Sequence, residues 1–161
     1  MRKSEGFDGD FFLLRDEVDL CWRIWLHGFK VLSIPSSIVY HYGSAIIKKT
    51  YSNPMMEFFF TRNNLIMFTK NYSSTNLVKY LPLFILLRTF VTIYNALKSK
   101  NPKYIKLLFD AIVWNLINLK KTLIKRWRVQ KSIRRVRDEE LIGRVISPKI
   151  FLISQLKLRV K

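Results

Sequence analysis

The fold of this chain depends most on a short stretch near its start, which reads Asp16-Glu17-Val18-Asp19-Leu20-Cys21-Trp22-Arg23 and is followed by Gly28, Pro35 and His41. Acidic residues open this stretch, and apolar residues then recur at helical spacing as far as Phe29. We therefore predict a helix that begins with Asp16 as N-cap, has Asp19 in the position of a capping-box acid, and ends near Gly28.

The residues after this helix favour extended structure. Residues 30–34 and 38–42 are rich in β-branched and aromatic residues, and Pro35 lies at the break between them. Turn-forming residues, Gly6 and Gly9 among them, precede the helix. The expected unit is turn, helix, strand and strand, so the fold class predicted for this region is α/β.

Charge divides the chain into two parts. The net charge is +18, yet six of the eleven acidic residues lie within the first nineteen positions. The acids have an ordinary explanation, because carboxylates favour the first turn of a helix and Asp19 and Arg23 have the spacing of an ion pair. The alternative is that the carboxylates take part in catalysis.

The uneven distribution of charge divides the chain into an acidic head, residues 1–50, and a basic, apolar tail, residues 51–161.

The full series of motifs favours the second explanation. It comprises Gly6-Phe7-Asp8-Gly9-Asp10-Phe11-Phe12, Asp16-Glu17-Val18-Asp19-Leu20, Arg23, Gly28, Pro35 and His41. This order resembles the C-terminal half of the catalytic domain of family 2 glycosyltransferases, in particular the rhamnosyltransferase-like members. The resemblance is close over about residues 5–45 and continues more loosely through Arg62-Asn63.

The resemblance implies a GT-A type α/β fold and the transfer of a sugar from a nucleotide diphosphate sugar to an acceptor hydroxyl, in glycan or cell-surface polysaccharide synthesis. It places Glu17 as the general base, with Asp16 as the alternative, and Asp19 as a residue that orients the site. His41 matches a position that completes the metal site or touches the diphosphate. The implied cofactor is a divalent metal, Mg²⁺ or Mn²⁺, which neutralises the departing diphosphate.

The resemblance also places a nucleotide-binding half, with its metal-binding Asp-x-Asp motif, before Gly6. The Asp8-Gly9-Asp10 sequence lies at the family's turn position, so we interpret it as a turn. We therefore expect the chain to be a C-terminal fragment, by truncation or through a wrongly assigned start, and to be inactive alone. Its partners in a complete enzyme would be a nucleotide-sugar donor and a glycan or lipid-linked acceptor.

Two helices are predicted at the start of the tail. Residues 54–71 form the first, and Arg62 in its middle would face the diphosphate by resemblance, or else be a solvated or snorkelling arginine. Residues 80–97 are almost wholly apolar and nearly long enough to span a bilayer. The central Arg88 would cost roughly 2.5–3.5 kcal/mol on insertion. We therefore favour an interfacial or re-entrant helix here, with a transmembrane span as the alternative.

The rest of the tail is basic and amphipathic. Residues 103–125 have the pattern of a basic amphipathic helix, and residues 120–137 contain nine basic residues and no acidic residue. Such a run is attracted to anionic lipid by about 1 kcal/mol per residue. No RNA-binding motif accompanies the charge, so nucleic acid is not the expected partner. We expect the cytoplasmic face of the cell membrane as the location. The competing function is a non-enzymatic basic module that binds anionic membrane or nucleic acid.

Overall fold

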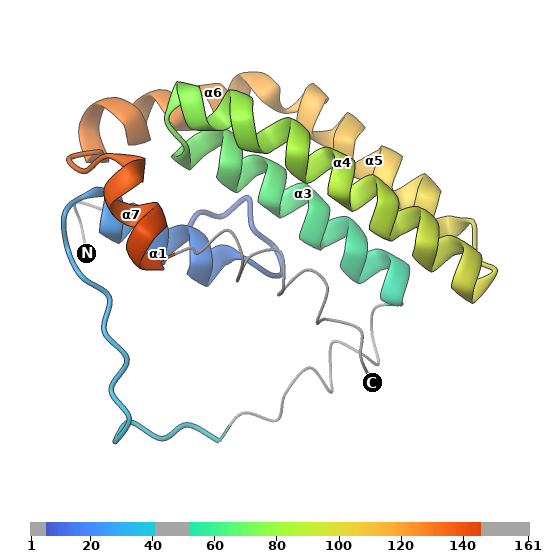
Figure 1. The fold of residues 1–161 in the computed structure, drawn as a ribbon, viewed down its shortest axis with the longest axis horizontal. Helices are drawn as coiled ribbons and strands as arrows, with labels where there is room; N and C mark the ends of the chain where they lie inside the picture. Colours follow the sequence, from blue (N-terminus) through green and yellow to red (C-terminus); the bar gives the residue numbers. More distant parts are fainter. Residues whose placement is uncertain (1–5, 41–51, 146–161) are drawn as a thin grey trace.

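The computed structural model describes residues 6–40 and 52–145, and the regular structure within these ranges is entirely helical (Figure 1). The elements are α1 (Asp16–Leu26), α3 (Asn53–Asn71), α4 (Ser74–Ser99), α5 (Lys103–Ile117), α6 (Leu119–Arg128), the π-helical turn η2 (Val129–Ile133) and α7 (Asp138–Val145). No strand occurs in the described part of the chain. The prediction of an α/β fold with short strands is therefore wrong.

The first predicted strand, residues 30–34, and the described part of the second, residues 38–40, lie instead in exposed chain after α1. Gly28 has a φ of +89°, which turns the chain away from the helix and confirms the predicted helix end. The following residues to Tyr40, which is 97% exposed, form no β-ladder within the described residues. A strand depends on hydrogen bonds from a neighbouring strand, so β propensity alone did not produce one here.

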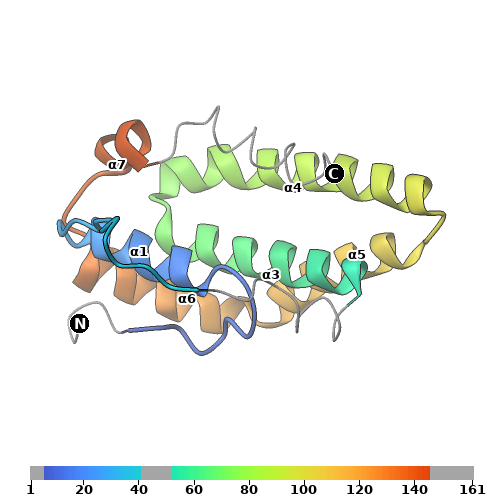
Figure 2. The same ribbon diagram turned by 90° about the horizontal axis from the view of Figure 1, so that it is seen from below.

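Three long helices pack side by side in the tail (Figures 1 and 2). The chain reverses at Tyr72-Ser73 between α3 and α4, and again at Lys100 between α4 and α5, where the backbone is left-handed. Helix α5 makes its most extensive contacts with α3 and also packs against α4. The predicted helix 54–71 is confirmed, with Pro54 near its start.

The helix predicted over residues 103–125 is broken in the structure. Helix α5 ends at Ile117 and α6 begins at Leu119, because Asn118 departs from helical backbone geometry. The Asn118 Nδ2 atom donates a hydrogen bond of 2.8 Å to the Trp114 carbonyl oxygen. Competition of this kind between an asparagine side chain and the helix backbone favours a break.

Head and tail share one hydrophobic core. Phe11 and Trp22 of the head belong to the same core as Phe68 of α3 and Tyr72, the residue after that helix, and the Trp22 and Tyr72 rings meet edge to face with centroids 4.6 Å apart. Ile133 of η2 completes this contact. Burial of such aromatic side chains is the main force that holds the acidic head on the helical tail.

Helix α4 buries both polar and apolar residues, and its open side is largely apolar. Its buried residues are Asn76, Phe84, Arg88, Thr92, Asn95 and Ala96. The exposed apolar side chains of α4 are Val78, Leu83, Leu86, Phe90, Ile93, Tyr94 and Leu97. With 26 residues, α4 is about 39 Å long at 1.5 Å per residue. Among the described residues it is the one helix long and apolar enough to cross a membrane.

Candidate functional site

The acidic pair Asp16-Glu17 forms the first turn of α1. The helix begins at Asp16 as predicted, and the residue before it, Arg15, is the N-cap. Arg15 has a left-handed backbone with a φ of +73°, and its side chain makes no capping hydrogen bond. Asp16 is therefore not the N-cap, and Asp19 is not a capping-box acid. The pair instead lies at the positive end of the helix dipole.

Glu17 has the properties of a proton acceptor. The residue is exposed to solvent, and the protein atoms around its carboxyl raise its pKa above the ordinary value by desolvation. A hydrogen bond and charge repulsion from Asp16 raise the pKa further. A carboxyl with a raised pKa beside a second carboxyl is a candidate for acid–base chemistry.

Two arginines lie close to the Phe60 ring of α3. The Arg15 guanidinium carbon lies 4.5 Å from the Phe60 ring centroid, and that of Arg88 lies 4.9 Å from the same centroid. The positive charge of Arg15 acts on Glu17, and Arg88 forms an ion pair with Glu57. The candidate base is thus next to a fixed positive group on the α3 surface.

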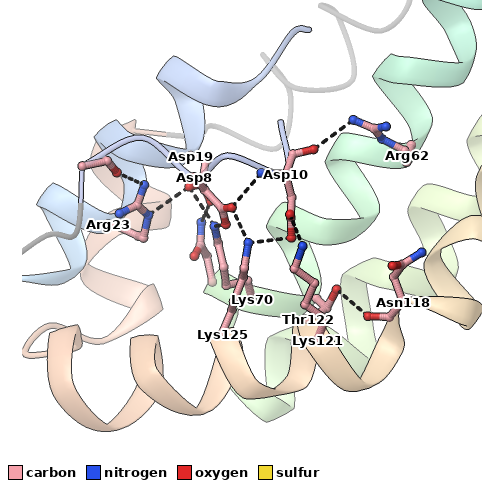
Figure 3. A network of polar contacts seen from close by, with 12 residues as sticks. Asp8, Asp10, Asp19, Arg23, Arg62, Lys70, Asn118, Lys121, Thr122 and Lys125 are labelled. Atoms are coloured by element: carbon pink, nitrogen blue, oxygen red, sulfur yellow. Dashed lines mark hydrogen bonds and ion pairs between the residues drawn. The ribbon is translucent and has the colours of Figure 1, made fainter. Parts of the chain in front are cut away.

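Asp19 has a different environment from the other two acids. Its side chain is fully buried, and its carboxylate accepts hydrogen bonds of 2.9 Å from Arg23 Nε, Lys70 Nζ and Asn71 Nδ2 (Figure 3). Lys70 is only 2% exposed. Asp19 therefore joins α1 to α3, which is consistent with a residue that orients the site without contacting substrate.

The Asp8-Gly9-Asp10 turn is held by lysines from two helices (Figure 3). Lys70 Nζ of α3 lies 2.6 Å from an Asp8 carboxylate oxygen, and Lys125 Nζ of α6 lies 2.5 Å from an Asp10 oxygen. Lys125 also pairs with Asp8, and Lys121 pairs with Asp10. We call Lys70, Lys121 and Lys125 the lysine clamp. No sequence motif predicted it, although the acidic head beside a basic tail indicated that the two parts attract each other.

The lysine clamp occupies the carboxylates that a metal would need. The described residues contain no group of three or more His, Cys, Asp or Glu side chains placed to hold a metal ion. Three ammonium groups bind Asp8 and Asp10, so these two residues do not fit a divalent cation. The predicted metal ligand, His41, lies outside the described residues.

Arg62 and Asn63 hold the head segment between the turn and α1. Arg62 Nη2 donates to the Asp10 carbonyl oxygen at 3.0 Å, and its guanidinium carbon lies 4.8 Å from the Trp114 ring centroid. Asn63 Nδ2 donates to the carbonyl oxygens of Leu13 and Leu14 at 2.6 and 2.7 Å. Arg62 is 8% exposed, so it is neither a solvated nor a snorkelling arginine. The predicted contact between Arg62 and substrate stays a prediction.

The lysine clamp should stabilise the fold against unfolding by acid. Burial alone would raise the pKa of Asp8 and of Asp10, but the charges and hydrogen bonds of the lysines outweigh burial and lower both below 3.8. A carboxyl whose pKa is lower in the folded state stabilises the fold above pH 3.8. This stabilisation is lost as the pH falls from 3.8 towards the pKa values of Asp8 and Asp10 in the folded protein. Lys125→Met should therefore move acid unfolding to higher pH, measured by far-UV circular dichroism.

The matched control for this prediction is Lys120→Met, which removes an exposed lysine from the same helix. We expect its acid unfolding to resemble that of the unmodified chain. Equal midpoints in the two variants would show that the lysine clamp contributes nothing to acid resistance.

Comparison with known proteins found no match: no family model, no curated protein and no solved structure is significantly similar to this chain.

Proposed function

We propose that this chain provides the acceptor-side carboxylates of a glycosyltransferase that acts in glycan or cell-surface polysaccharide synthesis. The donor would be a nucleotide diphosphate sugar, and the acceptor a glycan or a lipid-linked hydroxyl compound. The observation that carries the proposal is the Asp16-Glu17 pair at the start of α1, where the pKa of an exposed glutamate is raised. The family 2 resemblance of the surrounding motif supports it.

The proposed reaction requires one proton transfer to the protein. The acceptor oxygen attacks the anomeric carbon of the sugar while the bond from that carbon to the diphosphate breaks. The acceptor proton passes to the Glu17 carboxylate, with Asp16 as the alternative base. A raised pKa makes Glu17 a stronger base than an ordinary carboxylate, and its exposure leaves it accessible to an acceptor.

The other predicted site residues support this pair in the proposal. Asp19 fixes α1 on α3 through Lys70, and Arg62 fixes the turn that precedes the helix. Mg²⁺ or Mn²⁺ is the proposed cofactor of the complete enzyme, with His41 as its proposed ligand. Asp8 and Asp10 supply no part of that metal site, because lysines bind their carboxylates.

Attachment to the cytoplasmic face of the membrane is part of the proposal. The exposed side of α4 carries many large apolar side chains, whereas its buried residues include Arg88, Thr92 and Asn95. A large exposed apolar surface of this kind suits contact with lipid. A membrane-bound enzyme of this kind is well placed for a lipid-linked acceptor.

Sugar transfer by a fusion protein tests the proposal. The nucleotide-binding half of a GT-A type glycosyltransferase would be joined before Gly6 and supplied with nucleotide sugars and membrane acceptors. We expect transfer by the fusion and none by the chain alone, because positioning of the donor supplies a large share of such catalysis. Turnover by the chain alone would contradict the fragment interpretation. Failure of every fusion with a folded helical part would count against the transferase proposal.

The second candidate function is a membrane-binding module with no enzymatic role. The mixed apolar and basic exposed face of α6, described below, favours this alternative over nucleic-acid binding. In that case the Asp16-Glu17 pair would only stabilise the start of α1 through the helix dipole, and substitutions there would leave membrane binding unchanged.

A further inference from the structure

Helices α5 and α6 both carry large exposed apolar side chains. In α5 these are Ile105, Phe109, Leu116 and Ile117, and Lys103 and Lys106 are exposed near the start of the same helix. Helix α6 mixes two kinds of side chain, and its exposed residues are Leu119, Lys120, Lys121, Leu123, Ile124, Trp127 and Arg128, followed by Lys131 in η2. Spacings of three and four residues keep most of these side chains on one side of the helices.

The structure divides the basic residues of this region into two groups. Those of the first group make contacts within the protein: Lys121 and Lys125 bind the acidic turn, Arg126 donates to the Thr69 and Tyr72 carbonyl oxygens at 2.6 and 2.7 Å, and Arg134 pairs with Asp138. The second group is exposed and comprises Lys120, Arg128, Lys131, Arg135 and Arg137. About half of the basic run thus makes contacts within the protein.

Lys120, Arg128 and Lys131 belong to the second group and lie on α6 and η2 beside large exposed apolar side chains. Trp127 is 62% exposed within this set. Apolar residues, a tryptophan and cations on one face are typical of a helix that lies at the boundary between lipid headgroups and acyl chains. A net charge of +18 adds a long-range attraction to an anionic surface.

We propose that this face of α6 and η2 binds an anionic lipid bilayer, with Leu123, Ile124 and Trp127 inserted and the three cations on phosphate groups. The inference rests on the membrane attachment proposed above and adds to it a second surface, on α6 and η2, and a lipid class. It does not depend on sugar transfer.

The same cations could attract RNA, but the apolar side chains favour lipid. RNA recognition uses stacking aromatics and hydrogen bonds, and exposed leucine and isoleucine side chains do not serve it. Burial of Leu123 and Ile124 in acyl chains would instead give binding that persists at high salt. Salt dependence therefore separates the two partners.

The test is co-sedimentation of the full chain with vesicles of phosphatidylcholine alone or mixed with phosphatidylglycerol. The variant K120Q/R128Q/K131Q should lose on the order of 100-fold in affinity for the anionic vesicles at low salt. The control K30Q/R135Q/R137Q removes the same number of charges from exposed residues that lie near the end of α1 instead of on α6. There the Arg135 amide donates a hydrogen bond of 2.7 Å to the Leu26 carbonyl oxygen. The control should lose much less affinity.

A second variant addresses insertion. Trp127→Ala should weaken the binding that remains at high salt by roughly tenfold, and the blue shift of tryptophan emission on vesicles should decrease. Helical content by circular dichroism should be equal in all variants, since each change is at an exposed residue. Equal losses in the two charge variants would overturn the proposal. So would binding to RNA through these residues without binding to vesicles. No sugar donor is present, so the result is independent of the transferase proposal.

Discussion

Asp19→Ala is expected to lower the free energy of unfolding by about 3–5 kcal/mol, because it leaves two buried cations without their shared carboxylate. The side chains of Arg23 and Lys70 are 3% and 2% exposed, and both lie 2.9 Å from the same Asp19 oxygen. After the substitution Arg23 keeps its 2.6 Å hydrogen bond to the Gly6 carbonyl oxygen and Lys70 keeps its ion pair with Asp8, but both lose their contact with the buried Asp19 carboxylate. Chemical denaturation followed by circular dichroism measures this loss.

The chain contains a control with the same sequence spacing. Lys106 and Asp110 form another pair four residues apart, but their side chains are 73% and 36% exposed. Exposed pairs of this kind contribute about 0.2–1 kcal/mol, so Asp110→Ala should have a small effect. Similar losses in the two variants would show that Asp19 is not the link between α1 and α3 that the structure indicates.

Glu17→Gln is expected to reduce the turnover of the fusion enzyme by a factor of about 10²–10⁴, the usual contribution of a general base. Glutamine keeps the size and polarity of the side chain and removes the proton acceptor. In the unmodified fusion, turnover should fall as the pH drops through the raised pKa of Glu17, because the base must be deprotonated to act. This fall in turnover at low pH should be absent in Glu17→Gln.

Two further variants show whether the effect belongs to Glu17. Asp16→Asn tests the alternative base of the pair, and a larger loss there would exchange the two roles. Glu140→Gln changes an exposed carboxylate in the first turn of α7 and should leave turnover unaltered. If Glu17→Gln and Asp16→Asn both keep full turnover, the acidic pair does not supply the base.

Local sequence signals predicted where several helices begin and end. Asp16 opens α1, a positive φ at Gly28 follows its end, and Pro54 lies at the start of α3. Each depends on the backbone preferences of one or two residues, so tertiary contacts changed them little. Strands at residues 30–40 failed as a prediction because their stability depends on pairing, which local propensity does not provide.

The site was only partly predictable. The sequence predicted Asp16 and Glu17 at a helix start, and the structure places them there. It could not show that Asp19, two positions further along, is buried against α3, because a rotation of 100° per residue turns one acid to solvent and another to the core. His41 lies outside the described residues, so its role stays a prediction.

By itself, the sequence determined that this chain has an acidic head, a basic tail, a long apolar helix and an amphipathic helical region after it. Only the tertiary structure decided which basic residues bind the head and which face outward. Lys121 and Lys125 hold the Asp8–Asp10 turn, whereas Lys120 on the same helix is exposed. The physical reason is that charge attracts at any position along the sequence, but a buried ion pair forms only where packing brings the partners within about 3 Å.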